Sequence, residues 1–220
     1  MTMQLYSYFR SSASYRVRIA LNLKGVSYDT IPVHLLNHGG EQFAPAFSKL
    51  NPQSLVPVML VDAQPPLPPL IQSLAILEYL EECFPSPPLL PSGFAERAQV
   101  RQIALAIACD IHPLNNLRVL RMLKQELAVS EEQKRQWIAH WITLGFHALE
   151  QQLTSSPQRG DFCFGNAPTV ADCCLIPQIF NARRFDIDMT PYPPLVAIEQ
   201  AALALEAFQR AAPGVQPDAA

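Results

Sequence analysis

The first part of the chain alternates between short apolar runs and stretches with helical periodicity. Aromatic and β-branched residues gather in Gln4–Phe9, Tyr28–His34 and Leu55–Asp62, which predicts three strands. In Ser12–Lys24 apolar positions recur at helical spacing, and Gly25 follows where a C-terminal cap belongs. Strands therefore frame an early amphipathic helix.

The pattern continues through a second helix, a hairpin and a third helix. A short helical stretch is expected to end near Leu50, and the LIQS run after the turn AQPPLPP completes a hairpin. Prolines beside that last strand place it at a sheet edge, where a missing N–H costs least. Helical spacing returns in Ser73–Cys83. The order β-α-β-α-β-β-α predicts an α/β unit with a small mixed sheet.

After the proline-rich stretch FPSPPLLPSGF the pattern predicts helices only. Pro113 should kink or split the first of them. The sequence thus predicts an α/β domain over residues 1–85, a linker over residues 86–95, and an all-helical domain over residues 96–220. The expected helices are Glu96–Leu123, Glu131–Leu153, Thr169–Phe185 and Glu199–Arg210.

Composition narrows the classes of partner. Hydrophobic residues make up 49% of the 220, which is typical of a globular protein. The formal net charge of −3 argues against nucleic acid or anionic membrane as a bulk partner. No segment approaches the ~20 uninterrupted apolar residues of a membrane span, and the N-terminus lacks the apolar run of a signal peptide. A cytoplasmic location is expected.

The five cysteines form no CxxC pair, and Cys173 and Cys174 adjoin each other in an apolar run. This pattern predicts reduced, mostly buried thiols without disulfides or a zinc site. His34 and His38 are four apart, but the glycines after His38 end any helix there, so no metal site is expected.

The stretch FRSSASYR joins a strand exit to a helix start. The first N–H groups of a helix lack internal partners, and the helix dipole is positive there, so this end can hold a carboxylate, phosphate or thiolate. Ser11 and Ser12 could donate to the same anion, while Arg10 and Arg16 add positive potential. The alternative is that one serine only caps the helix.

Two further junctions could bind parts of one ligand. The Val56–Pro57 bond at a strand start is a candidate cis peptide, which would leave the Val56 backbone free to pair with an extended peptide. Gln72 and Ser73 stand at a strand-to-helix junction, where Ser73 is a candidate N-cap beside a second anion site. An ordinary strand start and an ordinary capping serine explain these features equally well.

Together the three sites match a short peptide with a central thiol. The chain resembles the glutathione transferases, and within them the zeta class, whose signature SSCxWRVRIAL appears as SSASYRVRIAL. The resemblance continues through NPQSLVPVM, IQSLAILEYLEE, CDIHPLNNLRVL, APTVADCCLIPQIFNARRF and the terminal QPD. It covers essentially the whole chain. It implies a thioredoxin-like N-terminal domain, a helical C-terminal domain and a homodimer.

Two positions depart from the signature. Ala13 replaces the cysteine and Tyr15 replaces the tryptophan. The missing thiol argues against side reactions that need a protein cysteine, such as reductive dehalogenation through a mixed disulfide. It leaves an isomerase reaction intact, because the attacking thiol there belongs to glutathione.

The resemblance also implies residue roles. Ser11, with Ser12 beside it, would activate the glutathione thiol. Other glutathione contacts fall on Gln42, Val56, Gln72, Ser73, His112 and Asn116. A short anionic, cis-unsaturated diketo acid would be held by Arg10, Arg118 and Arg184, since arginine binds carboxylates bidentately.

Spacing adds expectations for the neighbouring residues. His112, Asn115 and Arg118 should share one side of a helix. Arg18 and Arg183 are interpreted as solvated surface charges.

Two other residue pairs are interpreted as structural. Thr169 and Asp172 have the spacing of a capping box. Trp137 and Trp141 are assigned to the core.

The implied activity is glutathione-dependent cis–trans isomerisation of maleylacetoacetate, in tyrosine and phenylalanine catabolism. It would proceed by reversible addition of the thiolate to the cis double bond, with glutathione regenerated as a cofactor. Maleylpyruvate, in gentisate degradation, is the rival substrate, and no residue separates the two on physical grounds. A general transferase for small electrophiles and a non-enzymatic glutathione-binding protein are the remaining alternatives.

Overall fold

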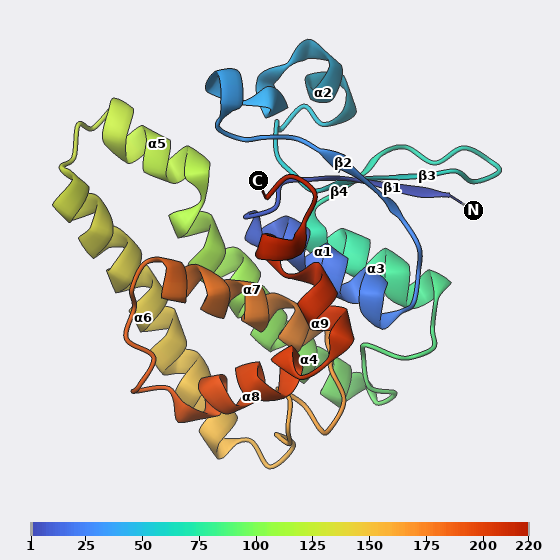
Figure 1. Ribbon diagram of the computed structural model, residues 1–220. Coiled ribbons are helices and arrows are strands. Elements are labelled where there is room, and N and C mark those ends of the chain that lie inside the picture. The colour runs from blue at the N-terminus through green and yellow to red at the C-terminus, as the bar shows by residue number, and fades with distance from the viewer. Residues whose placement is uncertain (1, 220) are drawn as a thin grey trace. The chain divides into compact units, whose positions relative to one another are not determined.

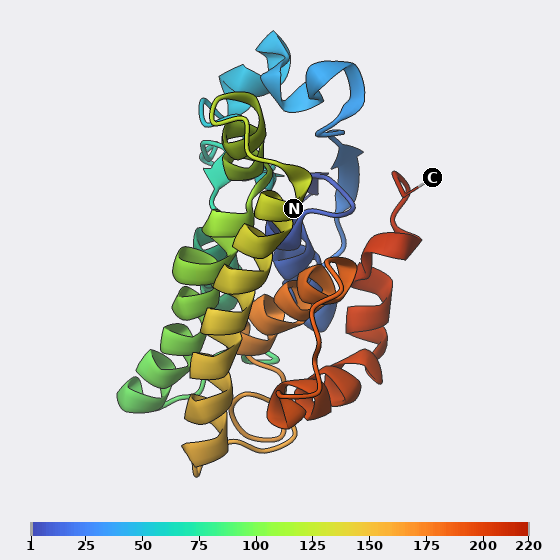
Figure 2. The ribbon, with the colours of Figure 1, turned by 90° about the vertical axis from the view of Figure 1, so that its left-hand side faces the viewer.

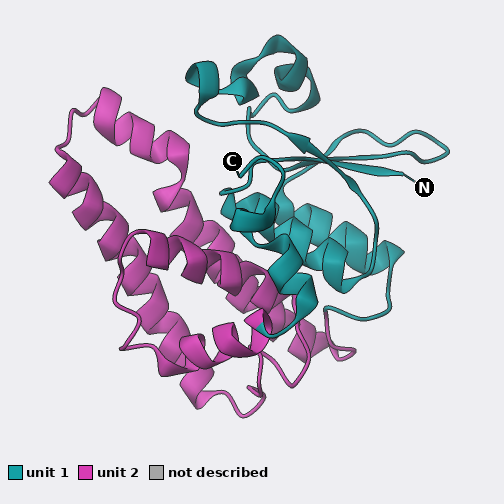
Figure 3. Cartoon of the chain, viewed as in Figure 1, with its two compact units in different colours: residues 1–89, 204–220 teal, residues 90–203 magenta. Residues whose placement is uncertain are grey.

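The computed structural model describes residues 2–219, which form two compact units (Figure 3). Unit 1 comprises Met1–Leu89 with Ala204–Ala220, and unit 2 comprises Leu90–Leu203. The predicted boundaries differ, because they assign the whole of residues 96–220 to the helical domain. The final residues pack instead with the N-terminal ones, since α9 (Glu206–Ala211) contacts α1 (Ser12–Leu23).

Within residues 2–219, unit 1 contains a four-stranded mixed sheet in the order β2-β1-β3-β4. β1 is parallel to β2 and antiparallel to β3, and β3 is antiparallel to β4. The predicted order of strands and helices along the chain and the mixed character of the sheet are confirmed, although each strand is shorter than its apolar run. The strands are β1 (Met3–Ser7), β2 (Asp29–Pro32), β3 (Val58–Val61) and β4 (Leu70–Ile71).

Helices cover both faces of this sheet. α1 and α3 (Ser73–Cys83) lie on one face, and α2 (Pro45–Leu50) lies on the other side (Figure 1). The side chains of β1 alternate between buried and partly exposed, as expected for the period of two in a strand. α1 ends as predicted, with Gly25 just beyond it at a φ of +65°, a conformation that favours glycine.

Unit 2 is helical throughout its described length. Figure 2 shows α6 running beside the chain that leads from α4 to α5, and α7 packs against α4. The helices are α4 (Phe94–Leu105), α5 (Leu117–Gln125), α6 (Glu131–Ser155), α7 (Val170–Arg184) and α8 (Pro193–Leu203). Within residues 2–219 we find no helix with the length and apolarity needed to cross a membrane.

The first predicted helix, Glu96–Leu123, is split as its proline indicated. After α4 come a π-helical turn, Ala106–Ile111, and a 3-10 turn, His112–Asn115, which contains Pro113. A Cβ at Gly145 of α6 would lie 2.3 Å from Cδ1 of Ile111, so α6 passes the π-helical turn where it has no side chain. Proline cannot continue the regular hydrogen-bond ladder, and the chain restarts as α5.

The last predicted helix, Glu199–Arg210, is wrong as a single element. α8 ends at Leu203, Leu205 is extended, and α9 begins at Glu206. No glycine or proline marks this break in the sequence. Its physical reason is tertiary, because α8 belongs to unit 2 whereas α9 packs on α1 within unit 1.

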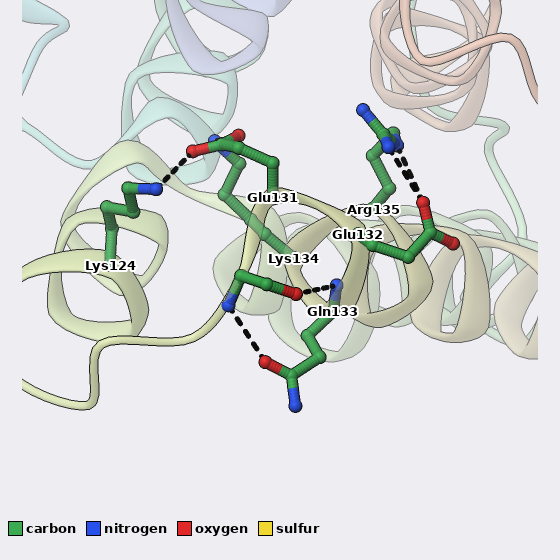
Figure 4. Close-up of polar contacts among 7 residues, drawn as sticks. Lys124, Glu131, Glu132, Gln133, Lys134 and Arg135 are labelled. Atoms are coloured by element: carbon green, nitrogen blue, oxygen red, sulfur yellow. Dashed lines mark hydrogen bonds and ion pairs between the residues drawn. The ribbon is translucent and has the colours of Figure 1, made fainter.

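Two helices of unit 2 begin with complete capping boxes. At the start of α7, Asp172 Oδ2 accepts hydrogen bonds from the Thr169 N–H and hydroxyl at 2.7 and 2.8 Å. The structural interpretation of these two residues is confirmed. At the start of α6, Ser130 and Gln133 satisfy each other's backbone N–H groups (Figure 4). Both helix starts are therefore fixed by local chemistry.

The tryptophan pair on α6 is half-buried. Trp137 and Trp141 meet edge to face with ring centroids 5.7 Å apart. Trp137 also donates to the carbonyl of Leu114 at 2.8 Å, which ties α6 to the 3-10 turn. The pair therefore packs this region of unit 2 together.

Candidate functional site

Strand pairing brings four chain segments of unit 1 to one edge of the sheet. Ser7 pairs with Pro32 in the parallel strands, Tyr6 pairs with Val58, and Val58 pairs with Ile71. The residues after β1, β2 and β4 and those before β3 therefore lie at the same edge. This edge carries the predicted site residues Arg10, Ser11, Ser12, Gln42, Val56, Gln72 and Ser73.

Ser11 is the N-cap of α1. Its Oγ accepts from the N–H of Ser14 at 3.2 Å, and its own N–H donates to the Tyr8 carbonyl at 2.9 Å. Capping occupies an acceptor lone pair of Oγ, so the hydroxyl proton remains able to donate. Ser12 is the first residue of α1 and is buried. The capping interpretation and the anion-site interpretation of Ser11 are therefore compatible.

The start of α3 differs from the prediction. Gln72, with a φ of +71°, is the N-cap, and Ser73 is the first helical residue. The prediction that Ser73 is the N-cap of α3 is therefore wrong. Its buried hydroxyl instead accepts from Arg16 Nη1 at 3.2 Å. Since Arg16 is in the second turn of α1, this bond ties α1 to the first turn of α3 near the two predicted anion sites.

The loop before β3 is ordered by a residue that the sequence reasoning missed. Asn51 is buried, its Nδ2 donates to the Leu55 carbonyl at 2.7 Å, and its Oδ1 accepts from the Gln53 N–H at 3.0 Å. Asparagine before proline is a turn signal that could have identified it. The bond between Val56 and the proline that follows it is cis, as predicted.

Gln53 connects that loop to the start of α3. Its Oε1 accepts from Gln72 Nε2 at 2.7 Å. The segment that carries Val56 is therefore held beside the two predicted ligands of the γ-glutamyl end, Gln72 and Ser73.

Gln42 lies in the loop that follows β2, in the 3-10 turn Glu41–Phe43. Glu41 holds this loop through its Oε2, which accepts from the His34 N–H at 2.6 Å. Gly40, with a φ of +120°, allows a close approach, because a Cβ there would lie 2.7 Å from Gln42 Nε2. Gln42 is buried, and among residues 2–219 its Oε1 has no hydrogen-bond partner. A buried acceptor of this kind fits a ligand that supplies N–H donors, such as a peptide.

Unit 2 carries the remaining predicted glutathione ligands in a different arrangement from that expected. His112 and Asn115 lie in the 3-10 turn, Asn116 is extended with a ψ of 149°, and Arg118 is on α5. The expectation of one shared helix side is wrong, because the chain leaves helical geometry between Asn115 and Arg118. Asn116 caps α5 by accepting from the Arg118 N–H at 3.1 Å. Within the described part of the chain, Oδ1 of buried Asn115 has no partner.

The three predicted substrate arginines are all exposed. The guanidinium of Arg10 lies 4.7 Å from the centroid of the Phe9 ring, and that of Arg184, the last residue of α7, lies 4.3 Å from the Phe185 ring. Arg118 lies in the first turn of α5. Stacking on an aromatic ring orients a guanidinium while leaving its edge open to a carboxylate.

The interpretation of Arg18 as a solvated surface charge is wrong. Arg18 is fully buried and donates to the Ala211 carbonyl at 2.9 Å, to Ser7 Oγ at 3.0 Å and to the Phe9 carbonyl at 3.0 Å. Burial lowers the pKa of Arg18 to about 10, which leaves the guanidinium charged at neutral pH.

Arg183 is partly exposed but is not simply solvated. It binds Glu199 with two nitrogens, and its Nε lies 2.9 Å from Oε1. Because Glu199 is on α8, this bidentate pair joins α7 to α8 within unit 2.

Comparison with known proteins gives matches over the whole length. The family model for the glutathione S-transferase N-terminal domain matches residues 10–83. A probable maleylacetoacetate isomerase of Vibrio cholerae is 51% identical, covering 100% of this chain and 99% of its own. A maleylpyruvate isomerase of a Ralstonia species is 48% identical, covering 99% and 100% respectively.

Solved structures match equally fully. The holo structure of a maleylpyruvate isomerase, described as a bacterial zeta-class glutathione S-transferase, has a TM-score of 0.92 and 46% identity over 100% of both chains. A maleylacetoacetate isomerase of Methylobacterium extorquens AM1, with bound malonate and glutathione, has a TM-score of 0.93 and 40% identity over 99% of both chains.

Proposed function

Because the chain belongs to the glutathione transferase family, in its zeta class, we propose that it is a glutathione-dependent cis–trans isomerase of maleylacetoacetate. The chain has the glutathione transferase fold, with a thioredoxin-like sheet in unit 1 and helices in unit 2. The observation that carries the proposal is the position of Ser11, which caps α1 at the sheet edge and keeps a hydroxyl proton to donate.

Glutathione, when bound, supplies a thiol that adds reversibly to the cis double bond and leaves after that bond has rotated. The hydroxyl of Ser11 and the first turn of α1 favour the charged form of such a thiol, whose ordinary pKa is about 8.5. Each lowering of that pKa by one is worth about 1.4 kcal/mol, so a modest stabilisation gives mostly thiolate at neutral pH. Ser12 supports the same turn.

The other residues of the sheet edge hold the peptide. Gln72, Ser73 and the N-terminus of α3 accept the γ-glutamyl carboxylate, and the backbone of Val56 pairs with the cysteinyl residue. Gln42 supplies an acceptor that is buried without a partner among the described residues. From unit 2, His112 and Asn116 complete the glutathione ligands in this proposal.

Arginines recognise the substrate. Arg10, Arg118 and Arg184 bind the charged groups of a small diketo acid and stabilise negative charge that develops beside its carbonyl. Malonate bound with glutathione in the Methylobacterium relative supports a small anionic substrate.

Maleylpyruvate is the second candidate substrate. The Ralstonia relative named for that reaction is nearly as similar as the Vibrio relative named for maleylacetoacetate. The remaining candidate functions are a general glutathione transferase and a non-enzymatic glutathione-binding protein. Both predict glutathione binding without isomerisation.

The first experiment measures glutathione-dependent isomerisation of the two substrates side by side, with the wild type, Ser11→Ala and Ser11→Gly. We expect each substitution to reduce kcat/KM for the preferred substrate by about a hundredfold, the usual effect of removing one donor from developing charge. Ser11→Gly costs a helix cap only a few tenths of a kcal/mol, so it separates chemistry from stability.

Ser130→Ala is the matched control. Ser130 also caps a helix with its hydroxyl, but it caps α6, which carries no predicted site residue. We expect a loss of about 1 kcal/mol in unfolding free energy without loss of turnover. Absence of turnover of both substrates at saturating glutathione would reject the isomerase and leave conjugation or binding.

We also propose that the enzyme is a cytoplasmic homodimer. The family supports the dimer, and the exposed rings of Phe43 and Phe94 are surfaces that a second chain could cover. The five cysteines are free thiols, three of them buried, which is typical of a reducing compartment. Recovery of the native protein outside the cytoplasm would contradict the location.

A further inference from the structure

A residue of the C-terminal segment, Asp218, contacts the turn that precedes α1 and ends at Ser11. Tyr8 to Ser11 form a four-residue turn closed by the Ser11 N–H to the Tyr8 carbonyl at 2.9 Å, so Phe9 and Arg10 are its central residues. The N–H of Phe9 donates to Asp218 Oδ2 at 2.9 Å. The conformation of Phe9 sets where Ser11 leaves the turn, and a carboxylate 209 positions away fixes it.

The carbonyl of Phe9 is also fixed, by an arginine that contacts the C-terminal segment as well. Its carbonyl accepts from Arg18 Nη2 at 3.0 Å, and Nε of the same guanidinium donates to the Ala211 carbonyl at 2.9 Å. Asn22 of α1 also binds the segment, with Nδ2 donating to the Ala207 carbonyl at 2.9 Å. The segment Glu206–Asp218 is thus attached to α1 and to its preceding turn at three points.

Asp218 is held in place by its own segment. Gln216 Nε2 donates to the carbonyls of Arg210 and Ala212, each at 2.9 Å, and the Ala219 N–H donates to the Gln216 carbonyl at 3.0 Å. Of the two Asp218 oxygens, Oδ1 is buried and has no hydrogen-bond partner among residues 2–219. Asp218 as a whole is partly exposed, so it is the contact of Oδ2 with the Phe9 N–H that fixes the carboxylate against the turn.

We propose that Asp218 is a positioning residue for the thiol site. It holds the Phe9 backbone so that the hydroxyl of Ser11 and the first turn of α1 face the glutathione thiol. This role rests on the proposed function, because it acts through Ser11. It gives the terminal QPD motif a task, with Gln216 ordering the segment and Asp218 making the contact.

The test compares wild type, Asp218→Ala and Asp218→Asn by two readouts that do not need substrate. The first is hydrogen exchange of the Phe9 amide in the ligand-free protein, and the second is the pKa of bound glutathione from thiolate ultraviolet absorbance. In Asp218→Ala we expect faster Phe9 exchange and a thiol pKa higher by about one, the value of a helix-terminus contact. The carbonyl of asparagine still accepts from Phe9, so Asp218→Asn should recover most of both effects.

Turnover supplies a third readout. For Asp218→Ala we expect kcat/KM to fall about tenfold to a hundredfold, as for small misplacements of a reacting group. Ser130→Ala is again the control, because its hydroxyl caps α6, which carries no predicted site residue and no part of the segment Glu206–Asp218. We expect it to lower the melting temperature without changing the thiol pKa. Equal thiol pKa values in Asp218→Ala and wild type would overturn the proposal, as would Asp218→Asn failing as fully as Asp218→Ala.

The thiol pKa measured in the wild-type protein distinguishes failure of this inference from failure of the proposed function. A wild-type protein that leaves the glutathione thiol pKa at its free value would overturn the proposed function and this role together. A lowered pKa in wild type that persists in Asp218→Ala would overturn only the role of Asp218.

Discussion

Single residues show how one polar group can serve both folding and chemistry. Ser11 caps α1 through its oxygen, and in the proposed function its hydroxyl proton is donated to the ligand. Arg18 instead acts through the fold, because its three hydrogen bonds go to protein acceptors on Ser7, Phe9 and Ala211. Both residues lie in the same signature stretch. Their different surroundings in the folded chain, a helix start for Ser11 and buried acceptors for Arg18, give them different roles.

Arg18→Lys tests the structural role. An ammonium cannot reach three acceptors that a planar guanidinium spans, so about two buried acceptors lose their partner. We expect the unfolding free energy to fall by roughly 3 kcal/mol, measured by urea denaturation. Arg183→Lys is the matched control, because its side chain is 47% exposed beside Glu199 and should cost less than about 1 kcal/mol. Equal losses in the two variants would contradict the assignment.

The local backbone structure of the candidate site was predictable from the sequence where its signal is local. The N-cap position of Ser11 and the cis bond after Val56 were both predicted, whereas the N-cap of α3 is Gln72 and not Ser73. The burial of Arg18 was not predictable, because the acceptor at Ala211 is 193 positions away. The contact between Phe9 and Asp218 was not predictable for the same reason, because the two residues are 209 positions apart in the sequence.

At the scale of elements, the approach to α6 combines a capping box with ion pairs. Figure 4 shows Lys124 at the end of α5 reaching Glu131 in the first turn of α6, with Nζ and Oε1 2.7 Å apart. Lys134 contacts the other oxygen of the same carboxylate. An acidic residue in the first turn also interacts favourably with the positive end of the helix dipole, which stabilises α6.

These contacts predict a pH response. Hydrogen bonds from Lys124 and then Lys134 lower the pKa of Glu131 to about 2, from an ordinary value of 4.5. Because the folded-state pKa is depressed, the stabilisation is present above about pH 4.5 and is lost as the pH falls towards 2. NMR titration of the carboxyl should show a low midpoint that rises in 1 M salt, where screening acts within about 3 Å. A midpoint near 4.5 at low salt would contradict this expectation.

Element boundaries were predictable where the stop signal is local. Gly25 ends α1 and Pro113 interrupts the first long helical run, as the sequence indicates. The break at Leu205 has no such signal and depends on packing in two different units. The expected alignment of His112 with Arg118 failed for a local reason, because Asn116 starts a new helix by capping it.

At the scale of the whole molecule, the division into units does not follow chain order. Unit 1 contains both ends of the chain, and the fully buried side chain of Phe208 on α9 belongs to it. Hydrophobic periodicity predicts that a segment is helical but not which partner it packs against. The alternation of strands and helices, by contrast, predicted the sheet of unit 1 correctly.

The proposed dimer is tested at the same scale. Phe94 is 92% exposed and Phe43 is 58% exposed, and large aromatic rings favour burial in an interface. We expect sedimentation equilibrium to give twice the chain mass of 24.5 kDa. A particle of 24.5 kDa across micromolar concentrations would reject the dimer.

The attachment of Asp218 to Phe9 also has a consequence for biosynthesis. A ribosome adds roughly 5–20 residues per second, so about ten to forty seconds separate synthesis of the two residues. During that interval the N-terminal sheet can form, but the turn before Ser11 lacks its final anchor. A nascent or prematurely terminated chain would therefore have its strands before it has a working thiol site. If Asp218 has the proposed role, catalytic competence therefore requires that synthesis has passed residue 218, long after the sheet of unit 1 is complete.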